Sequence, residues 1–219
     1  MVRAVVKPCP DVDDGVSCEN SPVRRLSYTF FDRGNILPGN GATHYLIRIE
    51  EARQQQPPRM AWRDGEQLPF LGRELGIQFS AGESVRREGE LLQVPFSKSS
   101  SPQMLRASVI EWLSGEARSL FAERVALYSP RLEVRKPEVR LSRARTQWGS
   151  CTGRGRVLLN WRLIHVPLRL VDYVVVHELS HLRELNHSPR FWALVENVYP
   201  GCRAARRELN RLEKKLPEL

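Results

Sequence analysis

The sequence has few of the features that mark secreted or membrane proteins. Its four cysteines (Cys9, Cys18, Cys151 and Cys202) are scattered, unlike those of a dense disulfide scaffold, and this fits a reducing compartment. No apolar run approaches the length of about 18 residues that a membrane-spanning helix needs. Residues 1–11 also lack the apolar core of a signal peptide. The sequence therefore predicts a soluble, cytoplasmic protein.

The first part of the chain has no net positive charge, whereas the second part has an excess of basic residues. Residues 1–130 contain 16 Lys or Arg and 16 Asp or Glu, whereas residues 131–219 contain 18 and 9, so the net charge of +9 comes from the C-terminal part. Such a field favours anionic partners: a nucleotide, nucleic acid or an acidic peptide. A solvated basic surface without a specific role is the alternative, because the arginines are dispersed.

The N-terminal third of the chain lacks sustained periodicity. It is interrupted by residues that break regular structure, including Pro38-Gly39-Asn40-Gly41 and Gln54-Gln55-Gln56-Pro57-Pro58. We therefore predict a poorly ordered or irregular extension over residues 1–65 and a single domain over residues 66–219.

Within that domain, strand-like and helix-like periodicity follow each other in blocks. Alternation of apolar and polar residues predicts strands over 71–79, 91–96 and 132–145, and glycines after Cys151 predict a hairpin whose second arm is 157–164. Apolar residues at three- and four-residue steps predict helices over 102–128, 167–185, 189–198 and 203–215. This order predicts an α+β fold with a small, mainly antiparallel sheet packed on helices.

The second of these helices carries the sequence H-E-x-x-H at His177, Glu178 and His181. An α-helix advances about 100° per residue, so the two histidines lie about 40° apart on one face, where both imidazoles can reach one ion. A third histidine, His187, follows six residues later. Six residues of helix would turn about 240°, so the helix must end between His181 and His187. Asn186 is a suitable left-handed end, and Ser188-Pro189 a suitable start for the next helix.

This pattern predicts one Zn²⁺ ion held by His177, His181 and His187. Zinc in catalytic sites takes about three protein ligands and keeps a position for water, whose pKa falls to near 7. Glu178 then stands where a general base is needed. A structural zinc site usually has four Cys or His ligands, and the nearby thiols are isolated. Imidazole also suits other divalent ions, which leaves the identity of the metal open.

Three segments resemble the YgjP-like metallopeptidase domain family, whose relatives are SprT-like and Wss-like zincins. They are WGSC at Trp148–Cys151, LNWRLI at Leu159–Ile164, and VVVHELSHLRELNHSPRFW at Val174–Trp192. The resemblance covers roughly residues 66–215 and implies a minimal zincin in which the three histidines bind zinc and Glu178 activates water. It also implies that the strand around Trp148–Cys151 borders the cleft, where zincins hold an extended peptide by main-chain pairing.

We expect substrate contacts from Trp148, Gly149, Ser150 and Cys151 in that strand. Arg145 and Arg162 are further candidates, because a guanidinium group can stabilise an oxyanion or bind phosphate. Packing roles for Trp148 and Cys151, and simple solvent exposure for the two arginines, are the alternatives.

The chain is therefore expected to be a zinc metallopeptidase that acts on a peptide or protein substrate. One alternative is a nucleoside triphosphate pyrophosphohydrolase, although no phosphate-binding loop of the G-x-x-x-x-G-K type is present. Another is a DNA-associated protease or binding protein that uses the basic C-terminal half.

Overall fold

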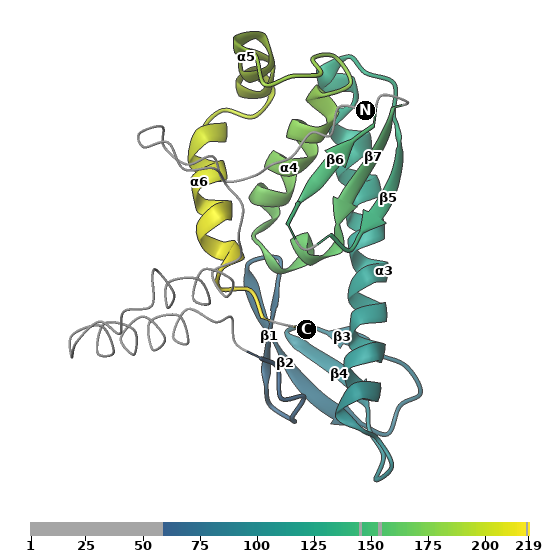
Figure 1. Ribbon diagram of the computed structural model, residues 1–219. Helices are drawn as coiled ribbons and strands as arrows, with labels where there is room; N and C mark the ends of the chain where they lie inside the picture. The colour runs from purple at the N-terminus through teal and green to yellow at the C-terminus, as the bar shows by residue number, and fades with distance from the viewer. Residues whose placement is uncertain (1–58, 145, 153–154, 218) are drawn as a thin grey trace, which may run out of the picture. The chain divides into compact units, whose positions relative to one another are not determined.

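The computed structural model describes residues 59–144, 146–152, 155–217 and 219 (Figure 1). Most of the predicted N-terminal extension and Arg145 therefore lie outside the described residues. The described part has the expected α+β architecture. Trp62, which precedes the predicted start of the domain, is buried in its core. Among the described helices, none is both long and apolar enough to cross a membrane.

The first sheet has four strands and contains one parallel pair. Its strands are β1 (Gln67–Phe70), β2 (Arg73–Ser80), β3 (Arg86–Glu88) and β4 (Leu91–Pro95), in the order β1-β2-β4-β3. The β2 and β4 strands are parallel, and the other two pairs are antiparallel. At the β1–β2 turn, Gly72 has φ +80°, and a Cβ there would lie 2.9 Å from Cγ of Pro167. Glycine therefore allows this turn to contact the chain just before the H-E-x-x-H helix.

The second sheet has three strands: β5 (Glu138–Ser142), β6 (Gly149–Cys151) and β7 (Arg156–Asn160), in the order β5-β7-β6. The predicted hairpin is present as the antiparallel β6–β7 pair. The β5 strand joins β7 in parallel. The described strands thus form two mixed sheets rather than one, and antiparallel pairs are the more numerous, as expected.

Two predicted strands are shorter than expected, for local reasons. The strand predicted over 132–145 begins only at Glu138, because η1 (Pro130–Leu132) is a 3-10 turn and Glu133 follows with φ +55°. The second arm of the hairpin ends at Asn160, whose side chain accepts a hydrogen bond from the Arg162 N–H at 3.0 Å. This bond caps a second 3-10 segment, η2 (Trp161–His165).

The long helix α3 (Pro102–Tyr128) runs beside both sheets (Figure 1). It begins as predicted, with Ser101 accepting a hydrogen bond from the Met104 N–H. One face is buried at the expected three- and four-residue steps: Leu105, Val109, Leu113, Ala117, Phe121, Val125 and Tyr128. This face contacts α4, η2, β4 and β5, so α3 connects the two sheets.

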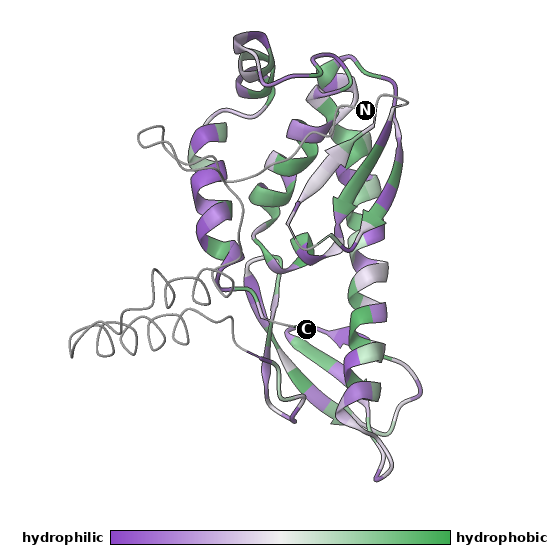
Figure 2. Ribbon diagram, viewed as in Figure 1, coloured by the Kyte–Doolittle hydropathy of each residue, from purple (hydrophilic) through white to green (hydrophobic). Residues whose placement is uncertain are grey.

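The H-E-x-x-H helix, α4 (Leu168–Ser180), lies at the centre of the domain. Every residue from Leu170 to Ser180 is buried, because α3, β6, β7, α5 (Pro189–Val198) and α6 (Cys202–Glu213) all pack against it. Figure 2 shows the contrast between the largely hydrophobic α4 and the largely hydrophilic α6. The helix predicted over 167–185 is too long, because α4 ends at Ser180; Leu185, beyond its end, is 59% exposed.

His165 is a buried histidine outside the predicted metal site. Its Nδ1 lies 2.7 Å from the Pro69 carbonyl oxygen, and burial lowers its pKa to about 4. The pKa of this histidine is about 6.5 in the unfolded chain and lower in the folded protein. Its contribution to the free energy of unfolding is therefore complete above pH 6.5 and is lost as the pH falls towards 4. The affected window is therefore pH 6.5 to 4.

We expect His165→Asn to remove this acid sensitivity, because the Asn amide can still donate to the Pro69 carbonyl but does not titrate. Between pH 6.5 and 4, the free energy of unfolding should fall by about 3 kcal/mol more in the wild type than in the variant. Urea unfolding at several pH values measures this difference. Parallel pH profiles for the two proteins would contradict the assignment.

Candidate metal centre

The end of α4 presents His177, Glu178 and His181 on adjoining faces of its last two turns. The helix ends at Ser180, and His181 forms its C-cap. Our prediction that Asn186 ends the helix is wrong. The chain leaves the helical path earlier, through hydrogen bonds from the Leu182 N–H to the Leu179 oxygen and from the Arg183 N–H to the Ser180 oxygen.

The segment after α4 returns the third histidine to the first two. Asn186 organises this return, because its side chain accepts a hydrogen bond from the Ser188 N–H at 3.2 Å. Ser188 then caps α5 by accepting from the Phe191 N–H at 3.3 Å, as the Ser-Pro pair predicted. His187 is thereby placed opposite the end of α4.

The three imidazoles converge on one point. One ring nitrogen each from His177, His181 and His187 lies within 4.8 Å of the others. Nε2 of His187 and Nε2 of His177 are 3.1 Å apart. Two nitrogens held about 2.0–2.1 Å from one tetrahedral ion would be about 3.3–3.4 Å apart, so this spacing fits a shared metal.

His181 has the hydrogen-bonding pattern of a ligand whose ring is held in place. Its Nδ1 lies 3.0 Å from the Glu184 carbonyl oxygen, which fixes the proton on that nitrogen. Its Nε2 is buried and has no hydrogen-bond partner in the part of the chain that the structure describes. A buried nitrogen with a lone pair and no protein donor is a site at which a metal ion fits.

Two aromatic side chains of α5 support the histidines. The ring of Phe191 stacks on His181, with centroids 4.5 Å apart, and the indole of Trp192 stacks on His187, with centroids 5.6 Å apart. These contacts hold the imidazole rings in fixed orientations and exclude water from one side of the cluster.

Electrostatics keep the imidazoles neutral. Burial lowers the pKa of His177 well below its usual value, with smaller contributions from His181, His187 and Arg206. Burial also lowers the pKa of His181 to about 4, and burial followed by the charge of Arg206 lowers that of His187. At neutral pH all three rings are therefore in the deprotonated form that binds metal ions.

Glu178 is the most unusual group in the cluster. Its side chain is fully buried, neither carboxylate oxygen has a hydrogen-bond partner among the described residues, and burial raises its pKa well above the usual value. A buried carboxyl group without partners is costly, which indicates a functional role. A nearby cation would counteract the effect of burial by favouring the charged form.

Glu178 fits only because residue 149 is glycine. A Cβ at Gly149 would lie 2.6 Å from Cγ, 2.7 Å from Oε1 and 2.8 Å from Cδ of Glu178. The strand β6 therefore passes directly over the carboxyl group. The sequence pattern predicts Gly149 only as a substrate contact, and nothing in it indicates this role in making room for Glu178.

The remaining predicted substrate contacts fall into two groups. Trp148 and Cys151 are buried and Ser150 is half-buried, all in or beside β6. Burial and then the charge of Glu178 raise the pKa of Cys151 to about 11, so its thiol stays protonated. Arg145 lies outside the described residues. Arg162 is not brought to the cluster; its charge acts on His165 and on Glu213.

Arg206 lies close to the site, although the sequence pattern does not single it out. The guanidinium carbon of Arg206, on α6, lies 5.6 Å from the centroid of the Trp192 ring. Its charge also reaches His177 and His187. Only the packing of α6 against α4 brings this arginine, 19 residues after His187, close to the histidines.

The chain is similar to one solved structure and to one known protein family. The crystal structure of the metallopeptidase zymogen of Pyrococcus abyssi abylysin is similar at 22% sequence identity, over 44% of this chain and 98% of that chain, with a TM-score of 0.39. No curated protein matches the chain. The model of the family described as YgjP-like, metallopeptidase domain, matches residues 44–212. Since this match covers most of the chain and includes the whole histidine cluster, the protein belongs to the YgjP-like metallopeptidase family.

Proposed function

We propose that the protein is a zinc-dependent peptidase in which His177, His181 and His187 hold one Zn²⁺ ion and Glu178 is the general base. The observation that carries this proposal is the convergence of three neutral imidazoles beside a buried carboxyl group without partners. The donor set also matches the three protein ligands that catalytic zinc usually has.

When bound, the zinc ion supplies a Lewis acid that polarises a carbonyl group and lowers the pKa of a nearby water molecule. The residues of the chain provide the rest of the chemistry. Glu178 can accept a proton from that water on a carboxylate oxygen and donate it to the amine that leaves the cleaved peptide bond. The backbone of Gly149 lies against the carboxyl group and covers it on one side.

Strand β6 is suited to hold the substrate. Among the described strands it pairs only with β7, and it also contacts α4. A peptide in extended conformation could add to the remaining edge of β6 by main-chain hydrogen bonds and would then pass Glu178. We propose this pairing as the reason that a strand of only three residues lies over the carboxyl group.

The test is metal content measured together with peptidase activity. We expect about one zinc ion per chain in the wild type and loss of cleavage of unfolded protein after chelation, with recovery when zinc is returned. His187→Ala should weaken zinc binding at least about tenfold, because it removes one of three ligands. His165→Asn is the matched control, since this buried histidine lies outside the cluster and its loss should leave zinc content unchanged.

The same preparations should be assayed with nucleoside triphosphates. Zinc-dependent release of phosphate or pyrophosphate without any cleavage of unfolded protein would replace the peptidase with a pyrophosphohydrolase. A wild-type protein that takes up no zinc would overturn the metal site itself.

A further inference from the structure

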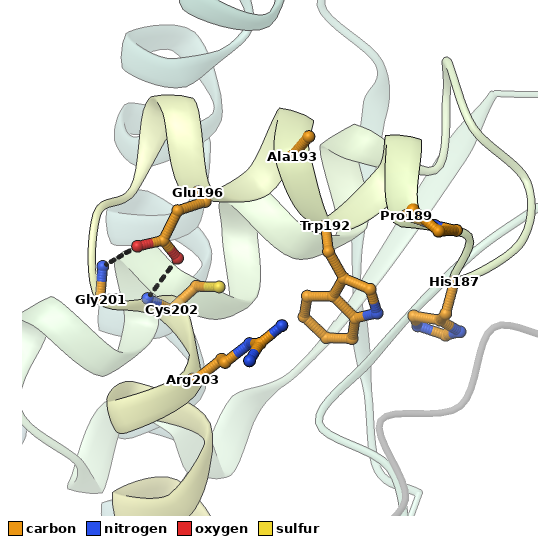
Figure 3. Close-up of a pocket in the computed structure, with 8 residues that line it drawn as sticks. All are labelled: His187, Pro189, Trp192, Ala193, Glu196, Gly201, Cys202 and Arg203. Atoms are coloured by element: carbon orange, nitrogen blue, oxygen red, sulfur yellow. Dashed lines mark hydrogen bonds between the residues drawn. The ribbon is translucent and has the colours of Figure 1, made fainter.

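A cavity of about 640 Å³ lies between α5 and α6, directly beside the histidine cluster. Its size is typical of sites that bind small ligands or side chains, about 300–1,000 Å³. Figure 3 shows His187, the proposed zinc ligand, at one end of the cavity and the start of α6 at the other. The lining residues are His187, Pro189, Trp192, Ala193, Glu196, Gly201, Cys202 and Arg203.

Trp192 forms the wall that the cavity shares with the metal centre. Its indole stacks on His187 at an interplanar angle of 28° and carries Arg206 over its ring. In Figure 3 the indole lies between His187 and Arg203, and the Arg203 guanidinium is turned towards it. A group that enters the cavity therefore meets an aromatic surface and a cation within the space adjoining His187.

Among the described residues that line the cavity, Glu196 has the one carboxylate, and this group already accepts hydrogen bonds from the backbone. Glu196 accepts hydrogen bonds from the Gly201 N–H at 2.8 Å and the Cys202 N–H at 3.3 Å, and Figure 3 shows its carboxylate turned towards these groups. Hydrogen bonds from the Cys202 thiol and the Gly201 N–H lower its pKa. Glu196 therefore stays ionised, and its negative charge is stabilised at the amino-terminal end of α6.

Arg203 acts on Glu196 only as a charge at longer range and does not form a close contact with it. Its guanidinium forms no ion pair and no hydrogen bond with any residue in the described part of the chain. Arg206 adds a second positive charge on the same helix, three residues away and on an adjoining face. The side of the cavity next to Trp192 therefore carries the positive charge of Arg203, whereas the Glu196 carboxylate lies at the start of α6.

We propose that this cavity is a substrate subsite that binds a carboxylate close to the cleaved bond, with Arg203 as the main recognition residue and Trp192 as the apolar wall. The inference rests on the proposed peptidase function and names the class of substrate. A guanidinium group binds a carboxylate through two parallel hydrogen bonds, and the indole face can cover the methylene groups of the side chain that carries it. The carboxylate can belong to an Asp or Glu side chain or to the C-terminus of the peptide.

The first experiment profiles cleavage by the zinc-loaded chain of 219 residues. The probe is a library of peptides of equal length, prepared once with free and once with amidated C-termini, and the products are identified by mass spectrometry. We expect about tenfold more cleavage at bonds that have an acidic residue or a free C-terminus at one fixed number of residues from the cleaved bond. Arg203→Glu should abolish this preference or reverse it towards Lys and Arg.

The control is the same charge reversal farther along α6. Arg211 is exposed and lies eight residues after Arg203, about 12 Å along the helix, which exceeds the screening length of about 10 Å at 0.1 M salt. Arg211→Glu should therefore keep the acidic preference. Loss of the preference in both variants would indicate a general effect of net charge and would overturn the subsite.

The second experiment measures binding without cleavage. The Glu178→Gln variant, alone and combined with Arg203→Glu, is immobilised and used to select peptides from the same library. Enrichment of carboxylate-bearing peptides that depends on Arg203 would support the subsite. If the wild type then cleaves no peptide, only the proposed peptidase function fails. Equal selection by both proteins, with cleavage that ignores carboxylates, would overturn the subsite and leave the peptidase function intact. The two library forms distinguish a side-chain carboxylate from a C-terminal one.

Discussion

Glu178→Gln should lower the rate of peptide cleavage by about 10³- to 10⁴-fold while leaving the zinc content unchanged. Glutamine has the same size as glutamate but cannot accept a proton from water, and the three histidines are untouched. Since Glu178 is fully buried without a hydrogen-bond partner among the described residues, a neutral amide should not destabilise the fold. Metal analysis, thermal unfolding and single-turnover cleavage of one preparation test all three points.

Glu213→Gln is the matched control for this substitution. Burial also raises the pKa of Glu213, but this residue lies at the last position of α6, where Arg162 and Lys214 are the charges that act on it. The control should keep wild-type activity. A Glu178→Gln variant that cleaves peptides at the wild-type rate would remove Glu178 from the mechanism, whatever the metal content.

Gly149→Ala should reduce activity about 100-fold and lower the free energy of unfolding by about 1–3 kcal/mol. The new Cβ would lie 2.6 Å from Cγ of Glu178, so either β6 or the carboxyl group must move. The backbone of β6 and the core of α4 are both tightly packed, and neither can yield without cost. Cleavage rates and urea unfolding of the variant measure the two effects.

Two further variants isolate the cause. Gly115→Ala is the control for replacing a glycine, because a Cβ at Gly115 meets no atom within 4 Å; in the middle of α3 it should stabilise the protein by about 0.5–1 kcal/mol. In a Glu178→Ala background the three clashing atoms are absent, so Gly149→Ala should then cost little stability. An unchanged cost in that background would show that Gly149 is required for another reason.

The features that the sequence by itself determined are those set by local physics. Helix periodicity places His177 and His181 on one face, and Ser-Pro pairs begin α3 and α5 as predicted, because these patterns depend on residues within one or two turns. The need for the chain to turn before His187 also followed from helix geometry. The position of that turn did not, because hydrogen bonds at Ser180 and the contact of His181 with the Glu184 carbonyl end the helix before Asn186.

Only the tertiary structure decided the features that join distant segments. The close approach of Gly149 to Glu178, the ion pair of Arg124 with Asp172 at 2.6 Å and the placement of Arg206 over Trp192 all depend on which elements pack against α4. The parallel pairing of β5 with β7 depends on the same packing. Alternation and charge describe one strand or helix at a time, whereas these contacts arise because a buried helix must be covered on every side, and the pattern of one segment does not reveal its neighbour.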